Sequence, residues 1–217
     1  MTNDAGLEFA EKTDTGLVRS QNEDAIAISP VHRFALLADG MGGYNAGEVA
    51  SRIAIGVTKS TLEDGFARMQ PHPLDAFRQR NKQLHQLVSD AIQRANTAIL
   101  DAAREEPEYK GMGTTLVAAV FRGDRLTIAH VGDSRAYRFR QGEIQQITRD
   151  HSFLQEQIDA GLIDAESARF SQNKNLVTRA VGVAAAMEVE IHEHRQKQAI
   201  FIYCAQMGYR ICWLHRK

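Results

Sequence analysis

Phe34–Tyr44, FALLADGMGGY, is the stretch in which an apolar run ends on an aspartate and then breaks into glycines. The run from Phe34 to Ala38 predicts a buried strand. A strand holds a carboxylate in a fixed place, and glycine, which lacks Cβ, lets a carbonyl or a substrate come close. The stretch therefore predicts that Asp39 is a metal ligand at a strand end. An ordinary strand followed by a tight turn is the alternative.

The composition predicts one globular domain without nucleic-acid or membrane partners. The 217 residues are 43% hydrophobic and 24% charged, and the net charge of −1 offers no basic surplus for nucleic acid or anionic lipid. No apolar run approaches the ~20 residues of a membrane span, and the N-terminus is not a secretion signal. Cys204 and Cys212 form neither a disulfide framework nor a CxxC zinc site. We expect a cytoplasmic protein whose residues 1–217 form a single domain.

Two other segments carry carboxylates beside predicted strands. RSQNED, residues 19–24, lies between the predicted strands 7–13 and 24–29. An arginine there can grip an oxyanion while its acidic neighbours hold metal, and a solvated connection is the alternative. Asp133, in HVGDSR, follows another strand that ends on Gly-Asp. Its alternative is a turn aspartate that bonds its own backbone.

The remaining pattern predicts helices and antiparallel strands. Asn45 and Glu48 predict a capped helix start, and residues 77–104 carry one apolar stripe at helical spacing, expected to be core. Further helices are predicted at 153–161 and 164–170, within a mobile insertion over the sheet. Short turns predict an antiparallel meander, and two further strands follow later in the chain. These strands are 116–121, 125–131, 136–140, 144–147, 188–194 and 199–204.

His192 and His194 are two residues apart in a predicted strand, which places both imidazoles on one face. Such a pair could bind a metal. The favoured interpretation is an exposed pair on an edge strand.

Five motifs in order resemble the metal-dependent Ser/Thr protein phosphatases of the type 2C, or PPM, class. They are RSQNED (19–24), ADGMGG (38–43), GMGTT (111–115), VGDSR (131–135) and RDHS (149–152). Residues 160–182 resemble the flap segment of the bacterial members, and the likeness extends over residues 8–204. It implies an α+β fold, a four-layer α-β-β-α sandwich of two antiparallel sheets flanked by helices.

The resemblance also implies a site with two divalent cations, Mn²⁺ or Mg²⁺, that bridge a water and activate it for attack on phosphorus. Asp39 would bridge both cations, and Glu23 and the carbonyl of Gly40 would complete one of them. Asp133 would support a third, weaker metal position. These are oxygen ligands, which hard cations prefer.

Two further residues have implied catalytic roles. Arg19 would hold the substrate phosphate, and Asp24 would orient metal-bound water. Met41 stands where some members carry a histidine general acid, so protonation of the leaving group would fall to metal-bound water. The implied activity is hydrolysis of phosphoserine and phosphothreonine on proteins, opposing a bacterial Ser/Thr kinase, by a monomer.

The resemblance breaks after Cys204. The family's second metal has two further aspartates, one in a Ser-Asp-Gly after the strand at 199–204 and one in an Asp-Asn beyond the next helix. Residues 205–217, AQMGYRICWLHRK, contain neither. The family-like region is thus 8–204, and residues 205–217 are an aberrant tail.

The genetic code offers an explanation for this tail. Residues Ala205–Trp213 can be encoded as GCT CAG ATG GGT TAT CGG ATA TGT TGG. From the third base the same string encodes Ser-Asp-Gly-Leu-Ser-Asp-Met-Leu, which contains the expected motif. We therefore expect a frameshift or truncation after about Cys204, with an unrelated short C-terminus as the alternative.

A chain with this tail is expected to hold one of its metals poorly, and to be unstable and nearly inactive. The lost segment would leave apolar surface and unpaired strand backbone. The alternative function is a non-catalytic pseudophosphatase, which would capture phosphoproteins with Arg19 and the remaining metal.

Overall fold

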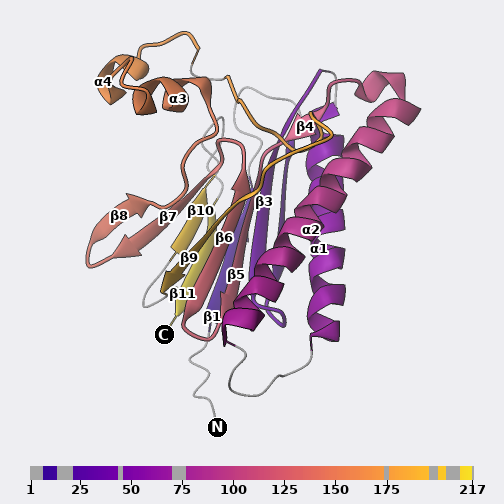
Figure 1. Cartoon of the computed structure of the whole chain (residues 1–217), viewed down its shortest axis with the longest axis vertical. Helices are drawn as coiled ribbons and strands as arrows, with labels where there is room; N and C mark the ends of the chain where they lie inside the picture. Colours follow the sequence, from indigo (N-terminus) through magenta and orange to yellow (C-terminus); the bar gives the residue numbers. More distant parts are fainter. Residues whose placement is uncertain are drawn as a thin grey trace.

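The structure is a computed structural model of the chain and describes residues 7–13, 22–43, 46–69, 77–173, 176–195, 200–203 and 211–216. Two antiparallel sheets stack face to face, and two long helices cover one of them (Figure 1). We call the sheet against the helices the inner sheet and the other the outer sheet. This arrangement confirms the expected α+β class.

The inner sheet has the strand order β2-β3-β5-β6-β9, with the short β4 paired to β3. All of its ladders are antiparallel. The strands are β2 (Asp24–Ser29), β3 (Phe34–Met41), β4 (Gly113–Thr114), β5 (Leu116–Arg122), β6 (Arg125–Val131) and β9 (Glu190–Arg195).

The outer sheet has the order β1-β11-β10-β7-β8 and is also antiparallel. Its strands are β1 (Leu7–Lys12), β7 (Arg135–Arg140), β8 (Glu143–Gln146), β10 (Ile200–Tyr203) and β11 (Ile211–Arg216). β11 lies in the predicted aberrant tail, yet it pairs with β1 on one side and β10 on the other. The expectation that the lost segment leaves strand backbone unpaired is therefore wrong where β11 pairs with β1 and β10.

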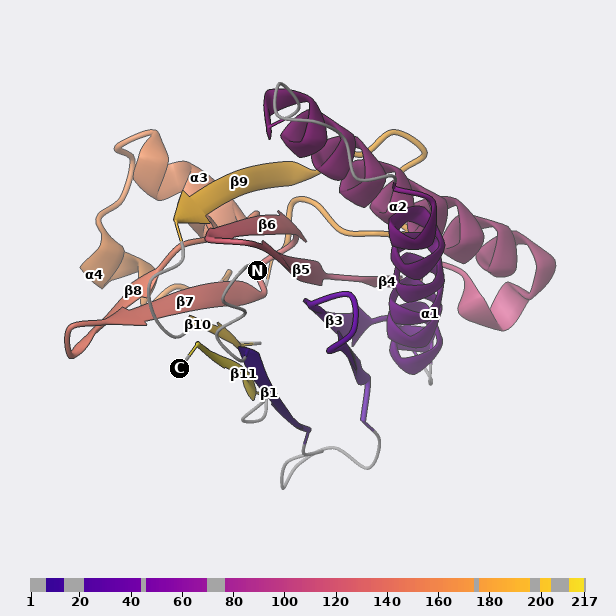
Figure 2. The same cartoon turned by 90° about the horizontal axis from the view of Figure 1, so that it is seen from below.

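The helices α1 (Ala46–Arg68) and α2 (Phe77–Glu105) pack on the inner sheet (Figure 2). The predicted apolar stripe of α2 is core, since Val88, Ile92 and Ile99 are fully buried. In the part of the chain that the structure describes, no long helix covers the outer sheet. The expected fourth layer is not seen there. Asn45, the predicted cap of α1, lies outside the described residues.

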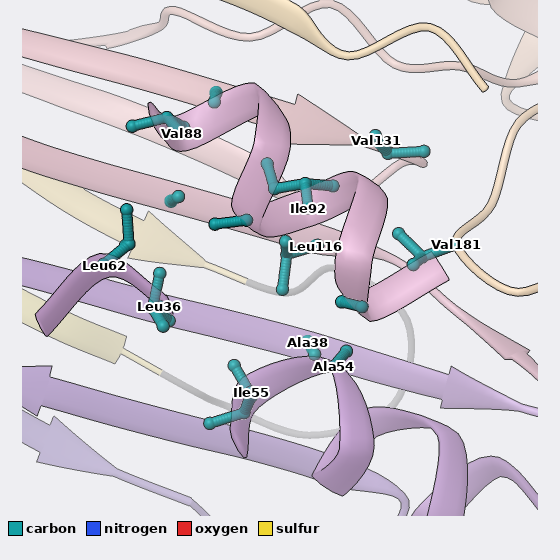
Figure 3. Packing of buried hydrophobic residues seen from close by; sticks show 14 of the residues in the cluster. Leu36, Ala38, Ala54, Ile55, Leu62, Val88, Ile92, Leu116, Val131 and Val181 are labelled. Carbon is teal, nitrogen blue, oxygen red and sulfur yellow. The ribbon is translucent and has the colours of Figure 1, made fainter. Parts of the chain in front are cut away.

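The strand β3 separates two apolar layers, which explains its continuous run of apolar residues. Leu36 and Ala38 face α1 and α2 in the larger core cluster, whereas Ala35 and Leu37 face the outer sheet in the smaller one (Figure 3). All four are completely buried. A strand that is covered on both faces needs apolar residues at every position, so its pattern does not alternate.

The predicted meander is wrong at one turn. β5–β6 and β7–β8 are adjacent pairs as expected, but β6 pairs next with β9 and β7 with β10. The turn at residues 132–134 therefore carries the chain from the inner to the outer sheet. This crossing places Asp133 at the end of the sandwich, between the two sheets.

The helical segment after β8 contains α3 (Phe153–Asp159) and α4 (Ala165–Ala168), beyond the ends of β7 and β8 in Figure 1. The side chains of Ser152 and Asp164 accept hydrogen bonds at the N-termini of α3 and α4. The segment returns to the inner sheet at Val181, which is fully buried and bridges to Thr114. Its mobility stays a prediction.

Candidate metal centre

Asp39 lies inside β3 rather than beyond its end, because the strand continues to Met41. Its register partner is Asp24 on β2, so two predicted site carboxylates are on neighbouring strands. The Asp39 N–H donates to the hydroxyl of Thr115 over 3.0 Å. Its carbonyl accepts from the Thr115 N–H and the Thr114 hydroxyl, both over 2.9 Å. Since both polar groups of the Asp39 main chain are bonded, its backbone, and with it the position of its Cβ, is held in place.

Glu23 and Gly40 meet the first turn of α1. The Gly40 N–H donates to the Glu23 carbonyl over 2.9 Å. A Cβ on Gly40 would lie 1.9 Å from the Gly47 carbonyl oxygen, and a Cβ on Gly47 would lie 2.8 Å from Glu23 Oε1. Glycine is thus required at both positions for the close approach. The positive end of the α1 dipole favours the Glu23 carboxylate at this place.

Gly40→Ala is expected to lower the free energy of unfolding by about 3 kcal/mol, because backbone must shift to admit the methyl group. Gly56→Ala is the control, since a Cβ at this α1 position meets nothing within 4 Å. That variant should gain up to ~1 kcal/mol from helix propensity. Urea denaturation measures both changes, and a Gly40→Ala protein as stable as the parent would contradict the packing described.

Asp133 is joined to the Asp39 segment through Thr115. Gly132, with φ of 103°, packs against Thr115 so tightly that a Cβ would lie 2.6 Å from its methyl group. The hydroxyls of Thr115 and Ser134 are 2.6 Å apart. Asp133 itself is only 9% exposed. Thr115 therefore holds the segments of two predicted metal ligands at the same end of the sandwich.

The structure places the four predicted site carboxylates in segments that adjoin one another and the Gly40 main chain. Carboxylate and carbonyl oxygens are the donors that Mg²⁺ and Mn²⁺ prefer, so this donor set fits a divalent cation. Arg19, the predicted phosphate ligand, lies outside the described residues. The four predicted site carboxylates are those of Glu23, Asp24, Asp39 and Asp133.

A network that the sequence did not predict supports the 132–134 turn. The main-chain N–H of His151 donates to the Gly132 carbonyl over 3.0 Å, and its Nδ1 accepts from the Gly132 N–H over 3.1 Å. His151 Nε2 lies 3.0 Å from Glu190 Oε2. His130 stacks on His151, with ring centroids 4.7 Å apart. RDHS marks His151 as part of a motif, but nothing in the sequence pairs it with residues 39 positions away.

His130, His151 and Glu190 are close enough to be considered as metal ligands, but their hydrogen bonds do not fit one. His151 Nδ1 accepts from an amide, so a neutral ring carries its proton on Nε2 and donates to Glu190. His130 Nε2 faces the Arg149 carbonyl over 2.8 Å and must donate. The two rings are nearly parallel, at 16°, so their lone pairs cannot converge. His151 and Glu190 are therefore joined by a hydrogen bond, while His130 stacks on His151 and is held by the Arg149 carbonyl.

Burial and these contacts shift two pKa values. Burial lowers the pKa of His130, against the opposing effect of its bond to the Arg149 carbonyl. Burial would raise the pKa of Glu190, but hydrogen bonds from His192 and His151 outweigh it and lower the pKa to about 2. Glu190 is thus a carboxylate at neutral pH, and His130 favours its neutral form.

Glu190 predicts a measurable loss of stability in acid. Its pKa falls from 4.5 in the unfolded chain to about 2 in the fold. The unfolded state binds more protons between these values, so the stabilisation is complete above pH 4.5 and is lost as the pH falls toward 2. We expect about 1 kcal/mol, since the carboxylate is partly exposed. Glu190→Gln should flatten this part of the pH–stability curve, and an unchanged curve would refute the assignment.

The family "Protein phosphatase 2C" matches residues 18–199. The chain belongs to the protein phosphatase 2C family. The family resemblance inferred from the five motifs is therefore confirmed.

Two similar proteins are bacterial phosphatases. The chain is 39% identical over 175 residues to the serine/threonine protein phosphatase PstP of Mycobacterium tuberculosis, which covers 81% of the chain and 31% of that protein. It is 34% identical over 182 residues to the serine/threonine phosphatase stp of Listeria innocua, covering 82% and 68%. The chain thus spans about a third of the length of the mycobacterial relative.

A solved relative has the same fold. It is the catalytic domain of the serine/threonine protein phosphatase PstP in complex with two manganese ions, with a TM-score of 0.71 and 35% identity. The match covers 90% of this chain and 76% of that one. No helix in the described residues is long and apolar enough to cross a membrane.

Proposed function

We propose that this protein phosphatase 2C domain hydrolyses phosphoserine and phosphothreonine on proteins with the help of divalent cations. The observation that carries the proposal is the convergence of Glu23, Asp39 and the Gly40 main chain at the end of the inner sheet. Two manganese ions in the structurally similar PstP domain support Mn²⁺ as a cofactor. When bound, divalent cations activate water and polarise phosphoryl oxygens.

Each acidic residue near the end of β3 has a proposed role. Asp39, whose main-chain groups are both hydrogen-bonded, would be a ligand shared by two cations, and Glu23 and the Gly40 carbonyl would be further ligands of one of them. Asp133, which is buried and whose neighbour Ser134 contacts Thr115, would serve a third, weaker position. Asp24, beside Asp39 on β2, would accept a hydrogen bond from the attacking water and orient it.

Arg19 completes the proposed site as the residue that binds the substrate phosphate. Its guanidinium can grip two phosphate oxygens at once. The proposed substrates are cytoplasmic phosphoproteins made by a bacterial Ser/Thr kinase, and the proposed acting form is the monomer.

We further propose that residues 205–217 are encoded in a shifted frame. They contain no carboxylate, so they supply neither of the two aspartates that the second cation needs. The 217-residue chain is then impaired, because Asp39 is left as the only protein ligand on one side. Sequencing the codons for residues 200–217 tests this proposal. Codons that do not allow the Ser-Asp-Gly reading would refute it.

The activity is tested by Mn²⁺-dependent hydrolysis of an aryl phosphate and of a phosphothreonine peptide. The assay uses both the 217-residue chain and the protein translated from the alternative frame. Activity that a chelator abolishes and Mn²⁺ restores is expected in the second protein. Hydrolysis that is insensitive to chelation, or none in either protein, would refute the proposed function.

A further inference from the structure

The layer between the two sheets changes from apolar to cationic at one edge. On β6, Leu126 and Ile128 belong to the core between the sheets. Their register partners on β9 are His194 and His192, and paired residues share a face of the sheet. β9 therefore turns two imidazoles, and Glu190 with them, toward the outer sheet.

The outer sheet contributes an arginine, Arg138, to the same edge. Ala136 on β7 belongs to the core between the sheets, and Arg138 lies two residues further along the same face. The edge strands β8 and β9 of the two sheets lie on the same side of the sandwich (Figure 2). A cavity of about 580 Å³ is lined by residues of both edges. Its lining includes Arg138, Thr148, Arg149, Glu190, His192 and His194.

Most charged groups of this cavity have a partner of opposite charge or a hydrogen-bond partner. Arg149 forms an ion pair with Asp159, and the Glu190 carboxylate is bonded to the imidazoles of His151 and His192. Arg138 is different: its NH2 group donates to the neutral side chain of Gln145. Among the described residues, no carboxylate forms an ion pair with Arg138.

Two nitrogens of the cavity are buried without a hydrogen-bond partner, Arg138 Nε and His194 Nε2. A buried donor without a partner costs about 1–3 kcal/mol. The pKa of His194 is lowered by burial and then by the positive charges of Arg138 and His192. Arg138 therefore places a positive charge beside two unsatisfied nitrogens, and an anion there would relieve both. Glu190, the carboxylate of the lining, is already bonded to His151 and His192.

We propose that the cavity between β8 and β9 is a binding site for a phosphate-type oxyanion, which accepts hydrogen bonds from Arg138 Nε and His194 Nε2. Charge-assisted bonds of this kind are among the stronger ones in proteins. The ligand is either free phosphate or the phosphate of a small metabolite. The site differs from the candidate metal centre, since Arg138 is about 10 Å along β7 from Arg135 at the 132–134 turn. It does not depend on the proposed function.

The test observes the two nitrogens directly. The full chain, ¹⁵N-labelled and in the presence of Mg²⁺, is titrated with inorganic phosphate at constant ionic strength. The NMR signals of Arg138 Nε and the His194 ring should shift and saturate. A parallel titration uses methylphosphonate, which cannot be hydrolysed and stands for a substituted phosphate. Saturation with both ligands indicates a phosphate-bearing metabolite, and saturation with phosphate alone indicates the free ion; both results support the site.

Three variants locate the site. Arg138→Gln should weaken binding by roughly 10- to 100-fold, the range for a lost charged hydrogen bond. Arg140→Gln removes the same charge from an exposed position two residues along β7, outside the cavity lining, and should leave the affinity unchanged. Asp39→Asn should also leave it unchanged, which separates this site from phosphate held at the metal centre.

Several results would overturn the proposal. One is a chemical-shift change of Arg138 Nε or the His194 ring that never saturates. Another is an equally large change at Arg140. Either result would mean general ion binding, or a water in place of the anion. Another is unchanged affinity in Arg138→Gln. If that variant does not fold, as judged by circular dichroism, His194→Gln takes its place with the same expected weakening.

Discussion

Replacing Asp39 with asparagine is expected to lower Mn²⁺-dependent phosphate ester hydrolysis by at least ~10³-fold, equivalent to ~4 kcal/mol in the barrier. The amide has the shape of the carboxylate but lacks its charge, so a divalent cation loses its central ligand. The main-chain bonds of Asp39 to Thr114 and Thr115 do not involve the side chain, so the fold should remain. The measurement is kcat on an aryl phosphate, in the protein translated from the alternative frame.

Asp124→Asn is the matched control for this variant. Asp124 is an exposed aspartate in the turn between β5 and β6, outside the candidate metal centre. The Asp124→Asn variant should retain full activity. Calorimetry on both variants separates loss of the cation from loss of the fold, because Asp39→Asn should bind Mn²⁺ more weakly while its thermal midpoint stays close to that of the parent. An active Asp39→Asn protein would refute the assignment of Asp39.

The second large effect is expected from the reading frame after Cys204. The protein translated from the alternative frame should bind two Mn²⁺ ions and hydrolyse the same substrates about 10²- to 10³-fold faster than the 217-residue chain. The reason is that two cations at one centre stabilise both the attacking and the leaving oxygen, whereas one cation cannot.

Titration calorimetry and initial rates test this pair of proteins side by side. A matched control changes Cys204 to serine in the 217-residue chain, which leaves the frame of the tail as it is and should bring no gain. Equal rates and equal Mn²⁺ stoichiometry in the two frames would refute the proposed impairment. A well-folded 217-residue chain that binds a phosphopeptide without hydrolysing it would instead favour the pseudophosphatase alternative.

The sequence predicted most elements because their signals are local. The stripe of α2 and the apolar run of β3 follow from spacing along one segment. The end of β3 was missed by a few residues, since Asp39 and Gly40 are poor strand residues that pair with Asp24 and Thr114. Tertiary pairing overrides propensity at such positions.

The candidate site could be predicted as a set of residues but not as an arrangement. The motifs pointed to Asp39 and Asp133, yet the link between them runs through the hydroxyl of Thr115, which no spacing reveals. The crossing at Gly132 also escaped prediction, because a Gly-Asp turn within one sheet and one between two sheets have the same local sequence. His151 was missed for a similar reason, since its partners are distant in the chain.

The pairing of β1 with β11 has a consequence for how the molecule assembles. Leu7 pairs with Arg216 in this ladder, so β1 cannot find its partner strand until residues 211–216 have been synthesised. Contacts this far apart in sequence are slow to form and leave an early strand exposed meanwhile. The inner sheet, with β2, β3, β5 and β6 close in order, can form on the ribosome before the outer sheet closes. Closure of the outer sheet is then the last folding step, and it depends on the tail whose reading frame is in question.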